Sequence, residues 1–400
     1  MSRTAWRLGL MMFLEFFIWG AWYVTVGNYM TVIGLTDVIY WAYTVSPIAA
    51  VVSPFFLGMV ADRFFATEKV LAALHLLGGL AILAAPSAGA SAGLFILLLL
   101  IHVLFYMPTL GLANSLAFHH IENQEKTFPR IRVFGTVGWI AANVLVSAVL
   151  EADATSIPLY VAGAASILMA FYCLTLPHTP PPAAGTRPSI GAILGLDALR
   201  KLSSRPFKVF IFSSLLLSIP LAAYYAYAPV FARSAGLESP AFQMSFGQMS
   251  EVLFMLAMPF FFARLGVKCM LVTGMAAWVV RYFLFASAAS SGSHALILLG
   301  ILLHGICYDF FFVTGQVYID QKSSSEIRGQ AQGFLVLVTY GVGMLLGAQI
   351  SGWVFNAVVP DPAVLEAWRL LWILPGAFAA AVLAIFALGF PTEEAVESTT

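Results

Sequence analysis

Apolar segments long enough to cross a lipid bilayer recur along the entire chain. A spanning helix needs about 20 mostly apolar residues, and counting on this basis gives twelve candidate spans. The first six are 6–30, 37–61, 68–86, 92–119, 131–150 and 157–176. The second six are 207–231, 241–263, 268–287, 295–319, 329–355 and 367–390. Backbone polar groups inside lipid must be satisfied within the protein. The pattern therefore predicts an all-α polytopic membrane protein.

Composition supports a membrane protein and excludes several other classes. Hydrophobic residues make up 61% of the 400 residues and charged residues 10%, whereas a soluble domain carries about 25% charged residues. The formal net charge is zero, which excludes a broadly basic surface for nucleic acid. Cys173, Cys269 and Cys307 lie far apart without ligand spacing, so we expect neither a disulfide nor a metal site. The first apolar run lacks a signal-peptide cleavage site, so we expect it to be a retained span.

A polar central segment divides the predicted spans into two groups of six. Residues 177–206 are Pro-rich and then basic, which separates an N-terminal half, 1–176, from a C-terminal half, 207–400. Lys and Arg in the short loops gather on one side, and only Arg233 and Arg369 fall on the other. Cytoplasmic loops carry the excess of positive charge. We therefore expect a multi-pass protein of the cell (inner) membrane with both termini in the cytoplasm.

The two halves echo each other weakly in sequence. The loop after the second span, Gly58–Arg63, corresponds in position to the loop after the eighth, Ala263–Lys268. Six plus six helices resemble the major facilitator superfamily, whose halves enclose a midplane site and rock to give alternating access. The Gly58-x-x-x-Asp62-Arg63 element resembles the signature loop of that superfamily. We expect Asp62 and Arg63 to form an inner-side gating loop, because they lie at the membrane surface and not at its centre.

Charged residues inside the spans are the first candidates for function. A charge at mid-bilayer costs at least about 2.5 kcal/mol unless it faces a polar interior. Glu251 lies in the middle of the eighth span, and Gln248, three residues earlier, shares its helical face. Glu15 is a second carboxylate of this kind, in the first span. These side chains predict a helix bundle with a polar interior.

Two further spans carry polar and aromatic stripes. Arg132, Thr136 and Trp139 follow one face of the fifth span at helical spacing. In the tenth span Asp309 lies directly beside Tyr308. Together with the eighth span, these stripes offer donors, carboxylate acceptors and aromatic planes. Such a set suits a neutral, hydroxylated ligand with a flat ring, because carboxylates bind vicinal hydroxyls and aromatic side chains stack on a ring.

Several of these residues also have a structural interpretation. Arg132 lies near the inner end of its span, so it could form a gate-closing ion pair instead of a substrate contact. Glu15 could carry protons, or could pair with Arg281 or another buried cation for purely structural reasons. Arg281 has no accompanying polar stripe and is expected to be a structural or interfacial cation. His75 and His102 are solitary, and we expect them to be satisfied within the bundle.

At these residues the chain resembles a narrower group, the bacterial nucleoside:proton symporter family. The similarity extends along nearly the whole chain. It is carried by FIWGAWYVTVGNYM, FYMPTLGLANSLAF, FPRIRVFGTVGWI, TLPH, LGLDAL, GQMSEVLFMLAMPFFFARLG, AWVVRYFLFA and HGICYDFF. The resemblance implies import of nucleosides together with protons. It also implies that the family's substrate-binding residues fall on Arg132, Thr136, Trp139, Gln248, Glu251, Tyr308 and Asp309.

This chain departs from the family pattern at four positions. The family's permeases place a glutamine and an asparagine on the seventh span, where this chain has Leu221 and Tyr224. A tyrosine of the permeases is His304 here, and a glutamine of the first span is Glu15. The carboxylates that face the ribose are thus kept, whereas the base-reading part is rebuilt with aromatic side chains. Leu221, Tyr224 and His304 are accordingly predicted to line the substrate site.

The sequence thus predicts a proton-coupled nucleoside importer, with Glu251, Asp309 and Glu15 as the candidates for proton coupling. The alternative is a major facilitator transporter for another small hydroxylated solute, such as a sugar or polyol, or a drug exporter. An intramembrane enzyme is not expected, because no H-E-x-x-H, G-x-S-x-G or paired metal ligands occur. We expect no cofactor beyond the coupling ion H⁺, a small-molecule substrate and the bilayer as partners, and a monomer.

Overall fold

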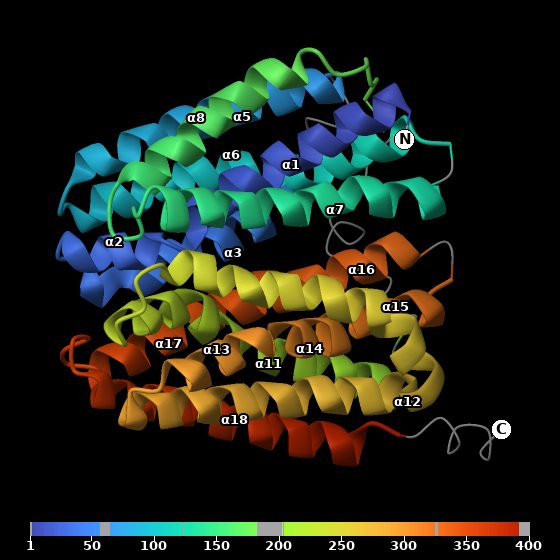
Figure 1. Cartoon of the computed structure of the whole chain (residues 1–400). Coiled ribbons are helices and arrows are strands. Elements are labelled where there is room, and N and C mark those ends of the chain that lie inside the picture. Colours follow the sequence, from blue (N-terminus) through green and yellow to red (C-terminus); the bar gives the residue numbers. More distant parts are fainter. Residues whose placement is uncertain are drawn as a thin grey trace. The chain divides into compact units, whose positions relative to one another are not determined.

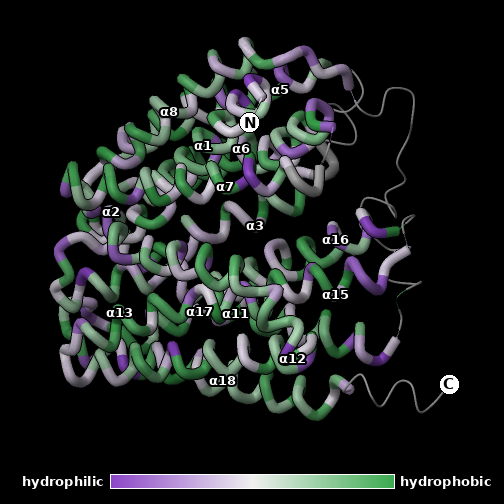
Figure 2. Tube along the Cα trace, turned by 45° about the vertical axis from the view of Figure 1, so that its right-hand side comes forward, coloured by the Kyte–Doolittle hydropathy of each residue, from purple (hydrophilic) through white to green (hydrophobic). Residues whose placement is uncertain are grey.

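The structure is a computed structural model that describes residues 2–56, 65–122, 124–181, 202, 204–324 and 327–391. Its described residues form helices joined by short turns (Figure 1). They divide into two compact units, Met1–Pro188 with Ser239–Ser245, and Ser189–Glu238 with Phe246–Thr400. Apolar residues run along most of the length of the helices in each unit (Figure 2).

The first unit is built around the first helix. Its helices are α1 (Arg3–Tyr23), α2 (Val26–Val32), α3 (Ile39–Phe56), α5 (Thr67–Ala84), α6 (Ala92–His119), α7 (Gln124–Asn143) and α8 (Ile157–Cys173), with the π-helical turn η4 (Val144–Val149) after α7. Helix α1 packs against α6, α7 and α8, and α5 packs against α6 and α8. Helices α1, α5, α6 and α8 therefore enclose the interior of this unit.

The second unit contains most of the longest helix that the structure describes; the first residues of this helix, up to Ser245, belong to the first unit. Its elements are α11 (Arg205–Ser234), α12 (Pro240–Ser291), α13 (His294–Leu302), α14 (His304–Tyr308), η5 (Asp309–Val313), α15 (Thr314–Lys322), α16 (Arg328–Val336), η6 (Leu337–Gly343), α17 (Met344–Val358) and α18 (Trp368–Gly389). Helix α11 packs against η6, α17 and α18. Both η5 and η6 are π-helical turns inside longer helices.

Helix α12 covers two of the predicted spans, 241–263 and 268–287. Gly266 interrupts it with φ 66° and ψ 172°, a conformation that residues with a Cβ atom rarely adopt. The residues on either side of Gly266 therefore form two helices that meet at a sharp kink. Gly266 lies between the two predicted spans, and each of them is helical.

Nine helices within the described ranges are long and apolar enough to cross a membrane, and Ile157–Cys173 is a shorter apolar helix. Each predicted span contains helical residues in the part of it that the structure describes. Because α12 accounts for two spans and two helices fall outside the nine, the count of twelve stays a prediction. Many large apolar side chains are exposed, among them Leu256 at 78% and Leu388 at 88%. In a bilayer such side chains contact lipid, so their exposure carries no cost.

Glycines allow the helices of the first unit to approach closely. A Cβ atom on Gly138 of α7 would lie 2.1 Å from the carbonyl oxygen of Phe13 on α1. A Cβ atom on Gly79 of α5 would lie 3.1 Å from the Cβ of Ser166 on α8. Small residues at helix contacts are the usual way for membrane helices to pack tightly. These contacts set which side chains of α1, α5, α7 and α8 can meet.

Some predictions fall on residues outside the described ranges. Asp62 and Arg63 of the predicted gating loop are among them. So are most of the central segment 177–206 and the tail after residue 391.

Candidate functional site

The predicted stripe of the fifth span lies on α7 beside α1. The guanidinium carbon of Arg132 is 4.0 Å from the centre of the Phe16 ring, a cation–π contact. Trp139 meets Trp19 edge to face, with ring centres 5.6 Å apart. Thr136 lies between Arg132 and Trp139 along α7 and is partly buried. The close approach at Gly138 holds α7 against α1 at this level, so the two helices fix the stripe together.

The carboxylate of the eighth span faces a histidine on α14. Glu251 Oε2 lies 3.8 Å from His304 Nε2, with the Glu251 side chain 20% exposed and His304 1% exposed. Ser250 Oγ donates to the carbonyl of Leu302 at 2.6 Å and accepts from the Gly305 N–H at 3.2 Å. These two hydrogen bonds hold the Glu251 turn of α12 against the start of α14.

Three rings form a stack next to this carboxylate. His304 stacks on Tyr224 of α11, with centres 5.3 Å apart and planes 16° from parallel. Tyr308 follows one helical turn later, 5.7 Å from His304 and tilted by 31°. Leu221 lies in α11 one turn before Tyr224 and is buried. The structure thus brings together the aromatic residues that the sequence assigned to the base-reading part.

Asp309 is the most deeply buried of the predicted ligand carboxylates. It opens the π-helical turn η5, its side chain is 0% exposed, and Glu251 lies near enough to repel it electrostatically. Neither of its carboxylate oxygens has a hydrogen-bond partner among the described residues. Gln248 Oε1 and Trp139 Nε1 are likewise buried without such a partner. Buried polar groups are almost always hydrogen-bonded, so unpartnered ones call for an explanation such as a ligand.

A model of the nucleoside H⁺ symporter family matches residues 1–395. The chain belongs to this family. YegT of Escherichia coli K12 is 39% identical over 397 residues, covering 97% of this chain and 93% of its relative. The xanthosine permease of the same organism is 32% identical over 403 residues, covering 96% of both chains.

Solved structures of family members and of distant transporters share the fold. The crystal structure of the nucleoside transporter NupG matches with a TM-score of 0.85 at 29% identity, covering 98% of this chain and 100% of NupG. The POT family transporter PepTSo matches with a TM-score of 0.76 at 14% identity, covering 100% and 99%. The predicted all-helical major facilitator fold is confirmed. Because family members are transporters, the protein is a transporter and not an enzyme.

Membership of the symporter family does not by itself assign ligand contacts to single residues. Arg132, Thr136 and Trp139 share one face of the first unit. Glu251, Tyr308 and Asp309 share one region of the second unit with Tyr224 and His304. Their roles in binding stay predictions.

Arg281 has a structural setting that its sequence context did not reveal. Its side chain is 0% exposed, and its Nε–H donates to the carbonyl of Gly300 at 3.0 Å. The guanidinium carbon lies 4.2 Å from the centre of the Tyr224 ring and 4.6 Å from that of Trp278. Arg281 is therefore a buried cation packed against the aromatic stack, and its Nη1 and Nη2 atoms have no hydrogen-bond partner among the described residues.

Glu15 contacts a histidine and not Arg281, the partner named from the sequence. Its Oε2 lies 3.0 Å from His75 Nε2, and both side chains are 0% exposed. His75 is therefore not solitary. No local pattern could have paired the two, because they are 60 residues apart on different helices.

Proposed function

We propose that this protein imports nucleosides into the cell together with protons, by alternating access. Membership of the nucleoside H⁺ symporter family supports this, as do relatives named xanthosine permease and nucleoside permease NupG, the latter 32% identical over 385 residues. The single observation that carries the proposal is Asp309, a buried carboxylate with both oxygens unpartnered among the described residues.

An unpartnered carboxylate at this depth needs a counterpart. Burying an ionised carboxylate costs several kcal/mol unless it is paired or hydrogen-bonded. A bound proton or the hydrogen-bond donors of a ligand can satisfy the two carboxylate oxygens of Asp309. A nucleoside presents two vicinal ribose hydroxyls, and a carboxylate accepts from both. We assign Asp309 and the nearby Glu251 to the ribose end of the ligand.

The aromatic side chains fit the base end. Tyr224, His304 and Tyr308 present ring faces and edges, and a flat base stacks on such rings. Leu221 and Tyr224 stand where other permeases resembling this chain carry an amide pair. We therefore expect the base to be recognised more by stacking than by paired hydrogen bonds. Arg132, Thr136 and Trp139 are proposed to contact the nucleoside from the N-terminal half.

Protons are the proposed coupling ion, and Glu251, Asp309 and Glu15 are the candidates for carrying them. Each is a carboxylate in a helix that is long and apolar enough to span a membrane. The pairing of Glu15 and Glu251 with imidazoles supports proton exchange at these sites. We further propose that the protein is a monomer and that both of its termini lie in the cytoplasm. The placement of Lys and Arg in the loops supports this orientation.

A binding experiment on the purified protein tests this function. Radiolabelled nucleoside is displaced by a panel of purine and pyrimidine nucleosides, free bases, ribose and maltose. We expect nucleosides to compete and maltose not to. Competition by the sugar with no competition by any nucleoside would contradict the proposal.

Matched variants test the carboxylate. Asp309→Asn keeps the shape and removes the charge, so we expect nucleoside affinity to fall about 10- to 150-fold, the equivalent of about 1.5–3 kcal/mol for a charged hydrogen bond. Glu366→Gln is the control, since Glu366 is 56% exposed and bonded to Arg369. Unchanged affinity in Asp309→Asn would remove Asp309 from the site.

A further inference from the structure

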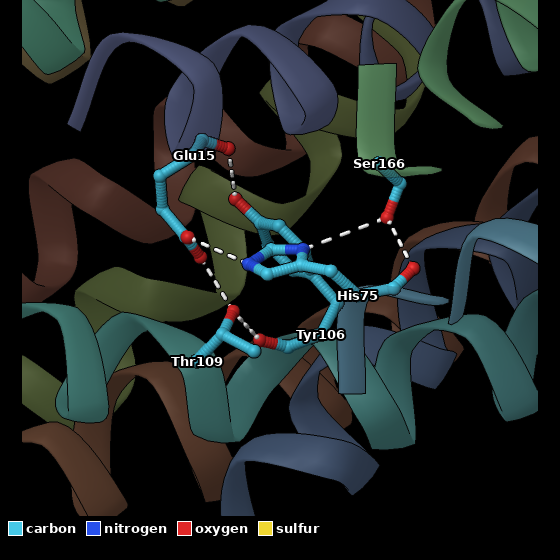
Figure 3. A network of polar contacts seen from close by, with 5 residues as sticks. All are labelled: Glu15, His75, Tyr106, Thr109 and Ser166. Carbon is cyan, nitrogen blue, oxygen red and sulfur yellow. Dashed lines mark hydrogen bonds and ion pairs between the residues drawn. The ribbon is translucent and has the colours of Figure 1, made fainter. Parts of the chain in front are cut away.

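Side chains from four helices of the first unit form a buried polar network (Figure 3). Glu15 comes from α1, His75 from α5, Thr109 from α6 and Ser166 from α8. Their exposures are 0%, 1%, 0% and 1%. The Tyr106 hydroxyl donates to the backbone carbonyl of Glu15 at 2.6 Å and closes the network from α6.

At the carboxyl end of the network, a proton bound to Glu15 Oε1 would have a hydrogen-bond acceptor in Thr109. Thr109 Oγ1 lies 2.5 Å from Glu15 Oε1 and 2.6 Å from the carbonyl oxygen of Tyr106. A threonine hydroxyl carries one hydrogen, so it can donate to only one of these two oxygens. The Tyr106 carbonyl can only accept. When that hydrogen goes to the Tyr106 carbonyl, the Thr109 oxygen is left as an acceptor, and a proton on Glu15 Oε1 can be donated to it.

At the imidazole end, His75 Nδ1 is a second position where a proton would have a hydrogen-bond acceptor, Ser166 Oγ. Ser166 Oγ donates to the carbonyl oxygen of His75 at 2.8 Å and lies 3.5 Å from His75 Nδ1. With its single hydrogen used on the carbonyl, Ser166 Oγ can only accept from Nδ1. That contact forms when Nδ1 carries a proton, and in this state a second proton on Nε2 would be donated to Glu15 Oε2, 3.0 Å away. The network therefore has two positions for one additional proton, one on Glu15 and one on His75.

A bound proton changes the net charge of the Glu15–His75 pair. Without it, Glu15 and a neutral His75 carry one net negative charge in an enclosed interior, and with it the pair is neutral. The titratable groups that face the pair are Tyr106 and His102 on α6 and Cys173 on α8. His102 is itself bonded to the carbonyl of Gly78. On α7, Arg132 is stacked on Phe16, the neighbour of Glu15 in sequence.

We propose that Glu15 and His75 form the proton-binding site of this transporter, separate from the carboxylates that bind the nucleoside. The site takes up one proton from water, on Glu15 Oε1 or His75 Nδ1, and its net charge changes from minus one to zero. Release to water on the other side of the membrane restores the negative charge. This assignment rests on the proposed function, because it names which of its candidate carboxylates carries the proton.

Transport in proteoliposomes separates proton coupling from nucleoside handling. Glu15→Gln should bind nucleoside and exchange it across the membrane as the wild type does. Its accumulation under an inward proton gradient should fall to a ratio of about one. Accumulation equal to that of the wild type would overturn the proposal. Loss of both exchange and accumulation in a variant that melts like the wild type would also overturn it, since Glu15 would then serve ligand handling.

Two variants sharpen the result. His75→Asn removes the second proton position and should also lose accumulation while keeping exchange. Glu68→Gln is the matched control, because Glu68 lies 3.0 Å from His178, whose side chain is 72% exposed, at the start of α5. Glu68→Gln should accumulate nucleoside as the wild type does.

Infrared spectroscopy tests the site without any nucleoside. Difference spectra between the wild type and Glu15→Gln isolate the bands of this one side chain. Carboxyl or carboxylate bands that change across the pH range in which carboxyl and imidazole groups titrate would support the site. Bands that do not change with pH would overturn it. If the wild type instead neither binds nor exchanges nucleosides, the proposed function fails while this measurement still decides the proton site.

Discussion

At the scale of single residues, the buried polar side chains of this symporter fall into two kinds. Glu15 and His75 satisfy each other, with Thr109 and Ser166 as further partners. Asp309 is equally buried and has no partner among the described residues. A paired carboxylate can hold a proton in place, whereas an unpaired one has free acceptors for a ligand. The contrast supports separate roles for the two.

His304 should act on the ligand through its ring. His304→Phe keeps a ring on Tyr224, whereas His304→Leu removes it. We expect the leucine variant to lose about 2- to 12-fold in nucleoside affinity, the equivalent of about 0.5–1.5 kcal/mol for an aromatic pair. The phenylalanine variant should stay close to the wild type. Calorimetric titration measures both, and equal losses would show that the ring nitrogens matter instead.

Arg281 should raise the thermal stability of the protein. Its guanidinium lies over Tyr224 and Trp278 in a site with no exposure, where each cation–π contact contributes up to about 2 kcal/mol. Arg281→Lys removes the planar group and should lower the melting temperature in detergent. Arg264→Lys is the control, since Arg264 stacks on Phe260 at 4.3 Å but is exposed. Equal melting temperatures for the two variants would contradict this role.

At the scale of helices, close contacts at glycine decide which faces meet. Gly138 brings α7 against the backbone of α1 and so sets the position of Arg132 and Trp139 relative to Phe16 and Trp19. In the second unit, a Cβ on Gly305 would lie 2.5 Å from Ser250 Oγ, so α14 approaches α12 where Glu251 and His304 meet. Backbone contacts therefore place the functional side chains.

Gly138→Ala should separate α1 from α7. Its Cβ would lie 2.1 Å from the Phe13 carbonyl oxygen, and overpacking costs about 1–3 kcal/mol. We expect a lower melting temperature and weaker nucleoside binding. Gly93→Ala serves as control, because nothing lies within 4 Å of its added Cβ and alanine favours the helix. A Gly138→Ala protein as stable as Gly93→Ala would show that α1 and α7 can separate without cost.

At the scale of the whole molecule, the proposed symport makes a prediction about energy. Moving one proton inward gains about 2.3 kcal/mol per 100 mV of potential, enough for about 50-fold accumulation of a neutral nucleoside. We expect a potassium diffusion potential, negative inside, to drive uptake into proteoliposomes, and a protonophore to abolish it. Uptake that is the same with and without the potential would show that no net charge moves with the nucleoside.

Much of this architecture follows from the sequence alone. Apolar length determines the membrane helices, because backbone polar groups in lipid must bond within their own segment. Gly266 marks the kink that separates two predicted spans. The motifs along the chain identify the symporter family, which the match over residues 1–395 confirms. Helical spacing also placed Gln248 and Glu251, and Arg132 and Trp139, on common faces.

Only the tertiary structure decided how side chains on different helices combine. Periodicity gives the face of one helix, but not which other helix that face meets. Glu15 and His75 are 60 residues apart, and Glu15 and Thr109 are 94 apart. His75 is held in this network by α5, which packs closely on α6 at Gly78 and on α8 at Gly79. The sequence by itself determined a membrane transporter with carboxylates in its spans, and the packing of helices decided which carboxylate is paired and which is left open for a ligand.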